Sequence, residues 1–281
     1  MSRRASATLT FGGTATALLR CGRFTVLTDP NFLHRGQWAY LGKGLASRRR
    51  TQPALGPTGL PPLDAIVLSH LHGDHFDRVA RRGLTRQVPL LTTPSAARRL
   101  ARYHFATVGM PTGTIETFRS GKETLDVESV PAIHARGVMR SLLPEVMGTV
   151  YTHRVEGDRQ TQVYVTGDTL TGDHVDVVAA ACPRLGAVVA RRGGPRRRGR
   201  TATMDDVQGA DLVRRVGVPL VVPIHHDDYG VFRSPLRDFL ARSPELPGVE
   251  IRPVARGATV DLRVDGRADA HREGPPGDPP G

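Results

Sequence analysis

The segment "SHLHGDHF" at residues 69–76 places three histidines and one aspartate within six positions: His70, His72, Asp74 and His75. Neutral imidazole and carboxylate are good ligands for zinc and related divalent ions, and such a site needs no thiolate. Glycine at position 73 allows a tight turn, so ligands on both sides of it can converge. The spacing H-x-H-x-D-H therefore predicts a metal site, and the alternative is a polar loop rich in histidine.

Four apolar runs elsewhere in the chain end in residues that can bind a metal. These are "AIVLSH", "VPAIH", "VYVTGD" and "VVPIH", which end at His70, His134, Asp168 and His225. Such runs predict buried strands, and strand ends can present side chains from a rigid scaffold into one cleft. A solvated histidine loop would not predict the three later residues. Seven candidate ligands are too many for one tetrahedral ion but suit two adjacent ions.

Several neighbouring residues have two interpretations. We prefer His225 to His226 as a ligand because His225 directly follows the strand. His226, Asp227, Asp228 and Tyr229 either line the cleft or form a solvated turn. Trp38 and Tyr40, in a long loop, belong either to a substrate lid or to ordinary loop packing.

The elements that must position these residues alternate between strands and helices, which predicts an α/β or α+β fold with layered helices. Residues 15–20 and 24–30 resemble a hairpin, and residues 34–62 predict a long loop. Helices are expected at 94–105 and 203–217, with a cap at Thr203 or Asp205 and a stop at Gly217. Further strands are expected at 63–70, 124–134, 162–168, 185–190 and 219–226.

The net charge of +12 suggests nucleic acid as a partner, but its distribution argues against it. Only Lys43 and Lys122 are lysines, and six arginines lie in the segment 191–200 without an acid or an aromatic residue among them. A base-stacking surface would need interleaved aromatic residues. The sequence has no run of 18 apolar residues, so we expect no membrane-spanning helix. The N-terminal residues also lack the apolar core of a signal peptide, and we therefore expect a cytoplasmic protein. Cys21 and Cys182 are expected to be reduced, partly buried thiols.

The "SHLHGDHF" segment, "PAIH", "VTGDT" and "VPIHHDDYG" together resemble the metallo-β-lactamase fold superfamily of metallohydrolases. The opening "TFGGTATALL" with "FTVLTDPNF" is similar to the branch of sugar-phosphate lactonases and N-acyl phospholipid phospholipases. The resemblance implies an α+β fold, a four-layer αββα sandwich with metals at one edge between two sheets. It implies one hydrolase domain over residues 1–262, and the polar tail 263–281 is expected to be disordered.

The same resemblance implies a role for each candidate ligand. His70, His72 and His134 would bind the first metal, and Asp74, His75 and His225 the second, with Asp168 bridging both. A metal-bound hydroxide would be the nucleophile, since metals lower the pKa of water from 15.7 to about 7. Asp74 would also act in catalysis by orienting the hydroxide or relaying a proton. Asp29, in "LTDPN", would support a ligand histidine. Two Zn²⁺ ions are expected, and Mn²⁺ or Fe²⁺ fit the same donors.

One feature departs from the resemblance. Arg191 and Arg192 interrupt the apolar strand 185–190 before Gly193, and four more arginines follow. An arginine run near the cleft could bind a phosphate or another anionic group. A solvated, mobile loop is the favoured interpretation, because the metals do not need these charges.

These observations predict a two-metal hydrolase that cleaves an ester-type bond in a small molecule or lipid, with phosphodiester, lactone and carboxylic ester as substrate classes. The arginine excess mildly favours an anionic substrate. One alternative is an RNase-like hydrolase that processes nucleic acid, which the basic charge supports and the closer resemblance opposes. Another is a non-catalytic or redox metal protein on the same scaffold.

Overall fold

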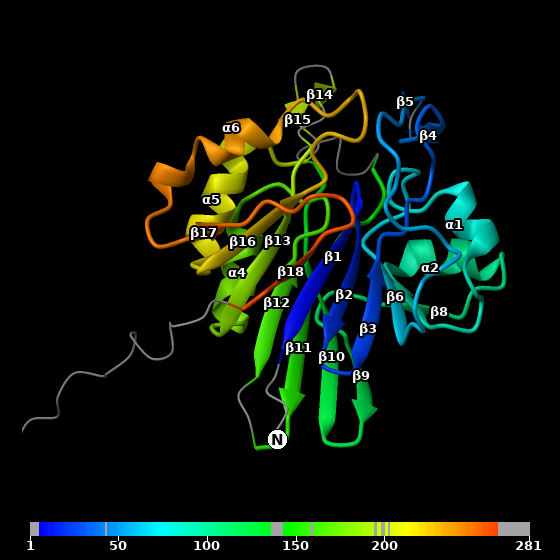
Figure 1. Ribbon diagram of the computed structural model, residues 1–281, viewed down its shortest axis with the longest axis horizontal. Coiled ribbons are helices and arrows are strands. Elements are labelled where there is room, and N and C mark those ends of the chain that lie inside the picture. The colour runs from blue at the N-terminus through cyan, green and yellow to red at the C-terminus, as the bar shows by residue number, and fades with distance from the viewer. Residues whose placement is uncertain are drawn as a thin grey trace, which may run out of the picture.

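Two seven-stranded sheets lie face to face, and helices cover both outer faces (Figure 1). The computed structural model describes residues 6–42, 44–135, 143–157, 160–193, 196–197, 200–201 and 203–263. The tail predicted to be disordered therefore lies outside the described residues from position 264 onward.

The first sheet begins as an antiparallel meander and continues as parallel strands. Its order is β18 (Thr259–Asp261), β1 (Ala7–Gly13), β2 (Thr16–Cys21), β3 (Phe24–Thr28), β6 (Ala65–Leu68), β7 (Leu90–Thr92) and β8 (Thr107–Gly109). Strands β2 and β3 form the predicted hairpin, with Leu18 opposite Leu27.

The second sheet has a parallel half and an antiparallel half. Its order is β17 (Glu250–Ile251), β16 (Leu220–Ile224), β13 (Leu185–Arg191), β12 (Thr161–Val165), β11 (Met147–Val155), β10 (Glu123–Pro131) and β9 (Ile115–Ser120). Four of these strands, β10, β12, β13 and β16, correspond to apolar runs in the sequence.

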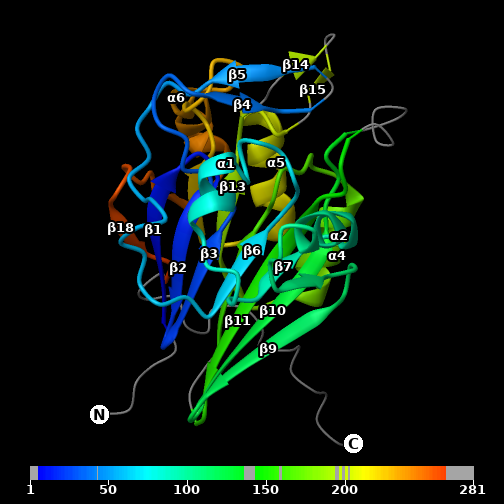
Figure 2. The same cartoon turned by 90° about the vertical axis from the view of Figure 1, so that its right-hand side faces the viewer.

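Figure 2 shows the helices and sheets from the side, and three apolar clusters hold these layers together. Buried side chains of both sheets, among them Phe11, Val67 and Val163, form the central cluster. Helices α1 (Arg78–Gly83) and α2 (Pro94–Ala101) pack on the first sheet. Helices α4 (Asp173–Ala181), α5 (Asp206–Val216) and α6 (Leu236–Leu240) pack on the second, and the 3₁₀ turn η1 (Ser243–Glu245) follows α6. This arrangement confirms the predicted αββα sandwich.

The predicted helix at 203–217 is confirmed as α5, and its ends follow the capping rules. The carboxylate of Asp205 accepts a hydrogen bond from the backbone N–H of Gln208 at 3.0 Å. Gly217 ends the helix with φ +67°, a left-handed conformation that glycine adopts without a Cβ penalty. Helix α2 is shorter than predicted and ends at Ala101, since residues 102–105 do not continue it.

The prediction of a long loop at 34–62 is wrong in one part. Strands β4 (Trp38–Tyr40) and β5 (Ala46–Arg48) form a small antiparallel ribbon with Ala39 opposite Ser47. Its strands have three residues each, too few for a two-residue alternation to be recognised in the sequence. A second short ribbon pairs β14 (Arg196–Arg197) with β15 (Arg200–Thr201). Both ribbons lie at the upper end of the molecule in Figures 1 and 2.

Both cysteines are free and buried, as expected. Within the described ranges, no helix has the length and apolar character that crossing a membrane requires.

Candidate metal centre

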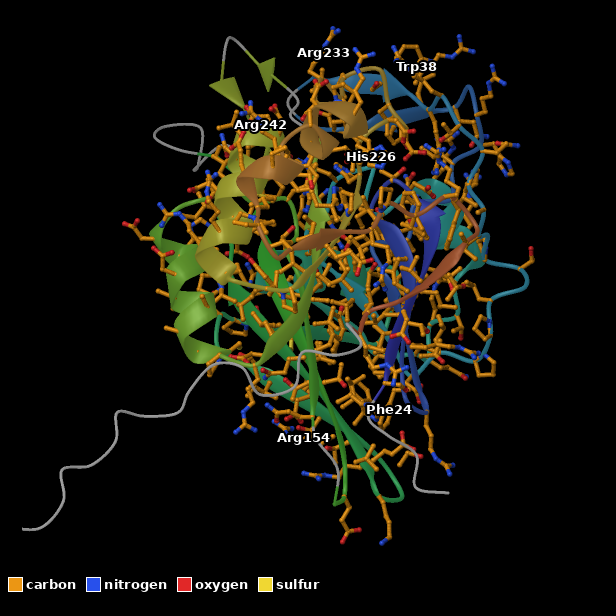
Figure 3. All side chains as sticks on the ribbon, turned by 60° about the vertical axis from the view of Figure 1, so that its left-hand side comes forward. Phe24, Trp38, Arg154, His226, Arg233 and Arg242 are labelled. Atoms are coloured by element: carbon orange, nitrogen blue, oxygen red, sulfur yellow. The ribbon has the colours of Figure 1, made fainter. Side chains whose placement is uncertain are left out.

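The predicted ligands follow strands whose carboxyl ends lie at one edge of the sandwich. Strands β12, β13 and β16 are parallel neighbours, and β10 runs in the same direction because two antiparallel pairings separate it from β12. Asp168 follows β12, His225 follows β16 and His134 follows β10. In Figure 3, His226, the residue after His225, lies in the upper half of the molecule toward Trp38 and Arg233, and away from Arg154 and Phe24.

His70, His72 and His134 form one group of candidate ligands. Nε2 of His70 lies 2.9 Å from Nδ1 of His72, and Nε2 of His134 lies 3.4 Å from the same Nδ1. The ligand atoms of this group are all within 4.8 Å of one another. Three imidazole nitrogens that converge so closely can bind one divalent ion.

Asp74, His75 and His225 form a second group within the same 4.8 Å limit. Oδ2 of Asp74 lies 3.4 Å from Nε2 of His225 and 3.8 Å from Nε2 of His75. The carboxylate of Asp168 is next to this group, with Oδ2 3.3 Å from Nε2 of His75 and Oδ1 3.9 Å from Nδ1 of His225. The charge of Asp168 also raises the pKa values of His70 and His72, against the larger effect of burial.

Several buried polar atoms of this second group and of Asp168 form no hydrogen bond among the described residues, although they lie within ion-pair distance of one another. They are Oδ1 of Asp74, Nε2 of His75, Oδ1 of Asp168 and both ring nitrogens of His225. Leaving one buried polar group without a hydrogen bond costs about 1–3 kcal/mol. Five such atoms at one point are therefore unfavourable unless another group satisfies them, and a metal ion is the group that matches nitrogen and carboxylate donors.

The backbone at this edge has unusual conformations and close approaches. His225 has φ +63°, which is strained for a residue other than glycine and is typical of functional sites. Gly73 lies in a turn but has no positive φ, so the turn alone does not require glycine. A Cβ at Gly73 would lie 2.5 Å from the carbonyl oxygen of Tyr40. Glycine is needed there because the loop carrying the first ligands packs directly on strand β4.

A buried carboxylate fixes the orientation of His75. Oδ1 of Asp29 lies 2.9 Å from Nδ1 of His75, so the Nδ1–H is directed at Asp29 and Nε2 is directed at Asp74 and Asp168. The same Oδ1 accepts hydrogen bonds from the backbone N–H and the hydroxyl of Ser69, at 3.0 and 2.7 Å. Asp29 also lies within ligand distance of His70 and His75. Both of its oxygens already accept from these donors and from Arg191, an arrangement that suits a carboxylate which orients a neighbouring imidazole.

The interpretation of Arg191 and Arg192 as part of a solvated loop is wrong. Strand β13 continues through Arg191, which pairs with Ile224 of β16, and both arginine side chains are buried. The guanidinium of Arg191 forms an ion pair with Oδ2 of Asp29 and donates to the Ser69 hydroxyl at 2.7 Å. Arg191 is the residue that the sequence interpretation missed. Its position at the end of a fifth apolar strand, parallel to those that end in ligands, was the available signal.

Arg192 has a separate structural role. Its guanidinium lies over the ring of Phe239 at 4.1 Å and donates to the Ser234 hydroxyl at 2.9 Å. These contacts anchor α6 to the strand end. Of the rest of the segment 191–200, residues 194–195 and 198–199 lie outside the described residues.

The sequence leaves two interpretations of the "HHDDY" turn open, a lining of the cleft and a solvated turn. Neither fits Asp228 and Tyr229, which are buried. Asp228 is buried beside Arg49, with Nη2 of Arg49 3.6 Å from Oδ1 of Asp228. The hydroxyl of Tyr229 donates to Oδ1 of Asn31 at 3.0 Å. His226 lies near Asp227 and is not in either ligand group, which is consistent with the preference for His225.

Burial and neighbouring charges separate the histidines into two protonation states. Burial lowers the pKa of His70 well below its ordinary value and lowers the pKa of His72 to about 4. Burial alone would also lower the pKa of His75, but the carboxylates of Asp168 and Asp74 raise it to about 10. At neutral pH the metal-free protein therefore contains neutral His70 and His72 and a cationic His75.

Because of this difference in protonation, the affinity for metal should depend on pH differently in the two ligand groups. Ligand imidazoles must be neutral, so a metal bound by the second group displaces the proton of His75. We expect the affinity of the second group for metal to rise with pH by up to about tenfold per unit below pH 10, and we expect His70 and His72 to release no proton at pH 7. Calorimetric titration of the metal-free protein with Zn²⁺, in buffers of different ionisation enthalpy, counts the protons. Equal proton release for both events, or unchanged release in His75→Gln, would contradict the assignment.

A family model and a curated relative both match most of this chain. Residues 25–226 match a family model described as "Beta-lactamase superfamily domain". A UPF0173 metal-dependent hydrolase of Nanoarchaeum equitans is 20% identical over 203 residues, which are 72% of this chain and 87% of that protein.

Two solved structures have the same fold. The isothiocyanate hydrolase from Delia radicum gut bacteria has a TM-score of 0.74 at 19% identity, over 90% of this chain and 98% of that chain. A possible metal-dependent hydrolase from Veillonella parvula has a TM-score of 0.74 at 18% identity, over 91% and 99% of the two chains.

Proposed function

The chain belongs to the beta-lactamase superfamily domain family, and from this membership we propose that it is a two-metal hydrolase that cleaves an ester-type bond. The observation that carries the proposal is the convergence of Asp74, His75, Asp168 and His225 at the strand ends, with five of their buried polar atoms unsatisfied among the described residues. The substrate is a small molecule or a lipid.

The residues present fit two divalent ions. His70, His72 and His134 would hold one ion, and Asp74, His75 and His225 would hold the other. Asp168, whose carboxylate contacts His75 of the second group, is proposed to bridge both. The donors are imidazole nitrogens and carboxylate oxygens, a set that suits Zn²⁺ and also accepts Mn²⁺ or Fe²⁺. When bound, the metals would supply Lewis acidity and lower the pKa of water at the site.

The chain's own residues complete the chemistry. Asp29, held by Arg191 and Ser69, keeps Nε2 of His75 directed into the site. Asp74 has one carboxylate oxygen, Oδ1, free of hydrogen bonds among the described residues, and that oxygen is the group proposed to receive and return a proton. Thr203 donates to Oδ2 of Asp168 at 3.0 Å and so fixes the orientation of the carboxylate between the two groups.

The buried arginines weaken the nucleic-acid alternative. Two of the six arginines in the segment 191–200, Arg191 and Arg192, are buried and contact other residues of the protein. Their charges are therefore not accessible to the phosphate backbone of a nucleic acid. Phosphodiester, lactone and carboxylic ester bonds remain the proposed substrate classes, since each requires water attack and stabilisation of a developing oxyanion.

A hydrolysis panel tests the proposal. The protein, loaded with Zn²⁺ or Mn²⁺, is assayed with bis-4-nitrophenyl phosphate, 4-nitrophenyl butyrate and a γ-lactone. We expect activity on at least one of them, and a loss of roughly 10²–10⁴-fold in Asp74→Asn, because general acid–base groups contribute that much. Asp227→Asn is the matched control, an acid outside both ligand groups, and should retain activity. No activity with either metal on any bond class, or equal losses in both variants, would refute it.

A further inference from the structure

A cleft of about 540 Å³ opens beside the first ligand group. His72 and Gly73 line it at the metal centre, and His72 is the only predicted ligand that is not fully buried among the described residues. Helices α1 and α2 form its walls together with strand β4, which lies next to α1 in Figure 2. A molecule that reaches the candidate metals through this opening therefore passes along these elements.

Three arginines give this cleft a positive charge. Arg78 and Arg81 lie one turn apart on α1, and Arg99 lies on α2. The guanidinium of Arg81 lies 4.6 Å from the ring centroid of Tyr103, and that of Arg78 donates to the carbonyl of Trp38 at 3.1 Å. Within the part of the chain that the structure describes, none of the three forms an ion pair with a carboxylate.

The one acidic residue that lines the cleft does not neutralise these charges by contact. Oδ1 of Asp77 accepts hydrogen bonds from the backbone N–H groups of Val79 and Ala80 at 2.6 and 2.8 Å. Oδ2 accepts from those of Phe32 and Leu33 at 2.5 and 2.7 Å. The carboxylate therefore caps α1 and fixes the preceding loop, and it leaves the guanidinium groups available to an external anion.

Another part of the cleft wall is apolar. It is formed by the side chains of Leu71, Phe76, Leu100, Leu143 and Pro144. Arginine binds oxyanions with charge-assisted and often bidentate hydrogen bonds, whereas such a wall favours a hydrocarbon or ring. The lining of the cleft therefore matches a molecule that has both an oxyanion and an apolar body.

We infer that this cleft binds amphiphilic anionic substrates, in which an apolar body connects the bond to be cleaved with a phosphate or carboxylate held by Arg78, Arg81 and Arg99. This inference rests on the proposed function for the cleavage, but the anion site itself does not depend on it. The arginines that select an anionic substrate are therefore those of α1 and α2, and the buried Arg191 and Arg192 are excluded from that role.

The chain contains a natural reporter for this binding. Trp38 is the only tryptophan and is 59% exposed, and its carbonyl accepts the hydrogen bond from Arg78, which lines the cleft. Occupation of the cleft is therefore expected to change tryptophan fluorescence without any catalytic turnover. Hexyl phosphate, hexanoate and hexanol share an apolar chain and differ in their head group. None of them absorbs light at the wavelengths at which tryptophan absorbs.

The test is a fluorescence titration of the full-length protein with these three compounds, with metal loaded and again after chelation. We expect hexyl phosphate or hexanoate to bind at least about tenfold more tightly than hexanol, and Arg81→Gln/Arg99→Gln to lose that preference. Arg82→Gln/Arg98→Gln is the matched control: the same change of charge at adjacent exposed positions of α1 and α2 that do not line the cleft.

The outcomes separate this inference from the proposed function. A preference for phosphate over carboxylate, or the reverse, identifies the head group, and either supports the anion site. Binding that survives chelation and needs Arg81 and Arg99 supports it even if no ester is hydrolysed. No preference for an anion over hexanol, equal losses in the control variant, or anion binding that disappears with the metals would overturn it.

Discussion

His225→Asn is expected to reduce the metal content from two ions to one per chain and to lower kcat/KM by roughly 10³-fold. His226→Asn is expected to keep two ions and to change kcat/KM by less than about threefold. The two histidines are adjacent in the sequence, but only the ligand atoms of His225 converge with those of Asp74 and His75. Asparagine is the chosen replacement because it tolerates the positive φ of position 225.

The experiment compares metal content and hydrolysis rates of the two purified variants with those of the wild type. Circular dichroism of the chelated proteins shows whether each variant folds, which separates loss of a ligand from loss of structure. If His226→Asn loses the metal and His225→Asn does not, the turn after β16 presents the other histidine and the second group is assigned wrongly.

The second large effect is expected at the ion pair between Arg191 and Asp29. Both side chains are 1% exposed, so Arg191→Met removes the guanidinium partner of a buried carboxylate and leaves it with His75 and Ser69 alone. Removal of one partner of such a pair typically costs about 3–5 kcal/mol of unfolding free energy. That is a large fraction of the roughly 5–15 kcal/mol by which domains are stable.

Replacing both partners tests whether the loss of stability comes from the unpaired buried charge. Asp29→Asn/Arg191→Met removes both charges and keeps an oxygen that can accept from Ser69 and His75. Its stability is expected to lie within about 2 kcal/mol of the wild type, because a buried pair gains little over neutral residues of similar size. Denaturant unfolding of the chelated proteins measures both values. A cost below about 1 kcal/mol for Arg191→Met, or a double variant less stable than the single one, would contradict the account.

The strand ends that carry the candidate site were predictable because buried strands leave a strong local signal. Runs such as "AIVL" and "VVPI" are wholly apolar, and the polar residue that follows each run marks the edge of a sheet. Helix α5 was predictable for a similar reason, since Asp205 and Gly217 cap it by local hydrogen bonds and a local φ.

The residues that were misjudged depend on contacts between distant segments. Arg191 meets Asp29 across 162 positions, and Asp228 meets Arg49 from another part of the chain. In sequence, each of these charged residues is typical of a solvated segment, because charge is seldom buried without a partner. The packing of the two sheets brings Asp29 to Arg191, and an isolated bridge between Arg49 and Tyr229 brings Arg49 to Asp228. The cleft between α1 and α2 is likewise formed by packing, and its arginines have no motif.

The most direct test of the central claim is the number of metal ions that the chain binds. The purified protein is chelated, titrated with Zn²⁺, dialysed and analysed for metal per chain, and the titration is repeated with Mn²⁺ and Fe²⁺. We predict two ions per chain with at least one of these metals, one for each ligand group. One ion or none with all three metals would contradict it and would leave the unsatisfied atoms of Asp74, His75 and His225 without the partner proposed for them.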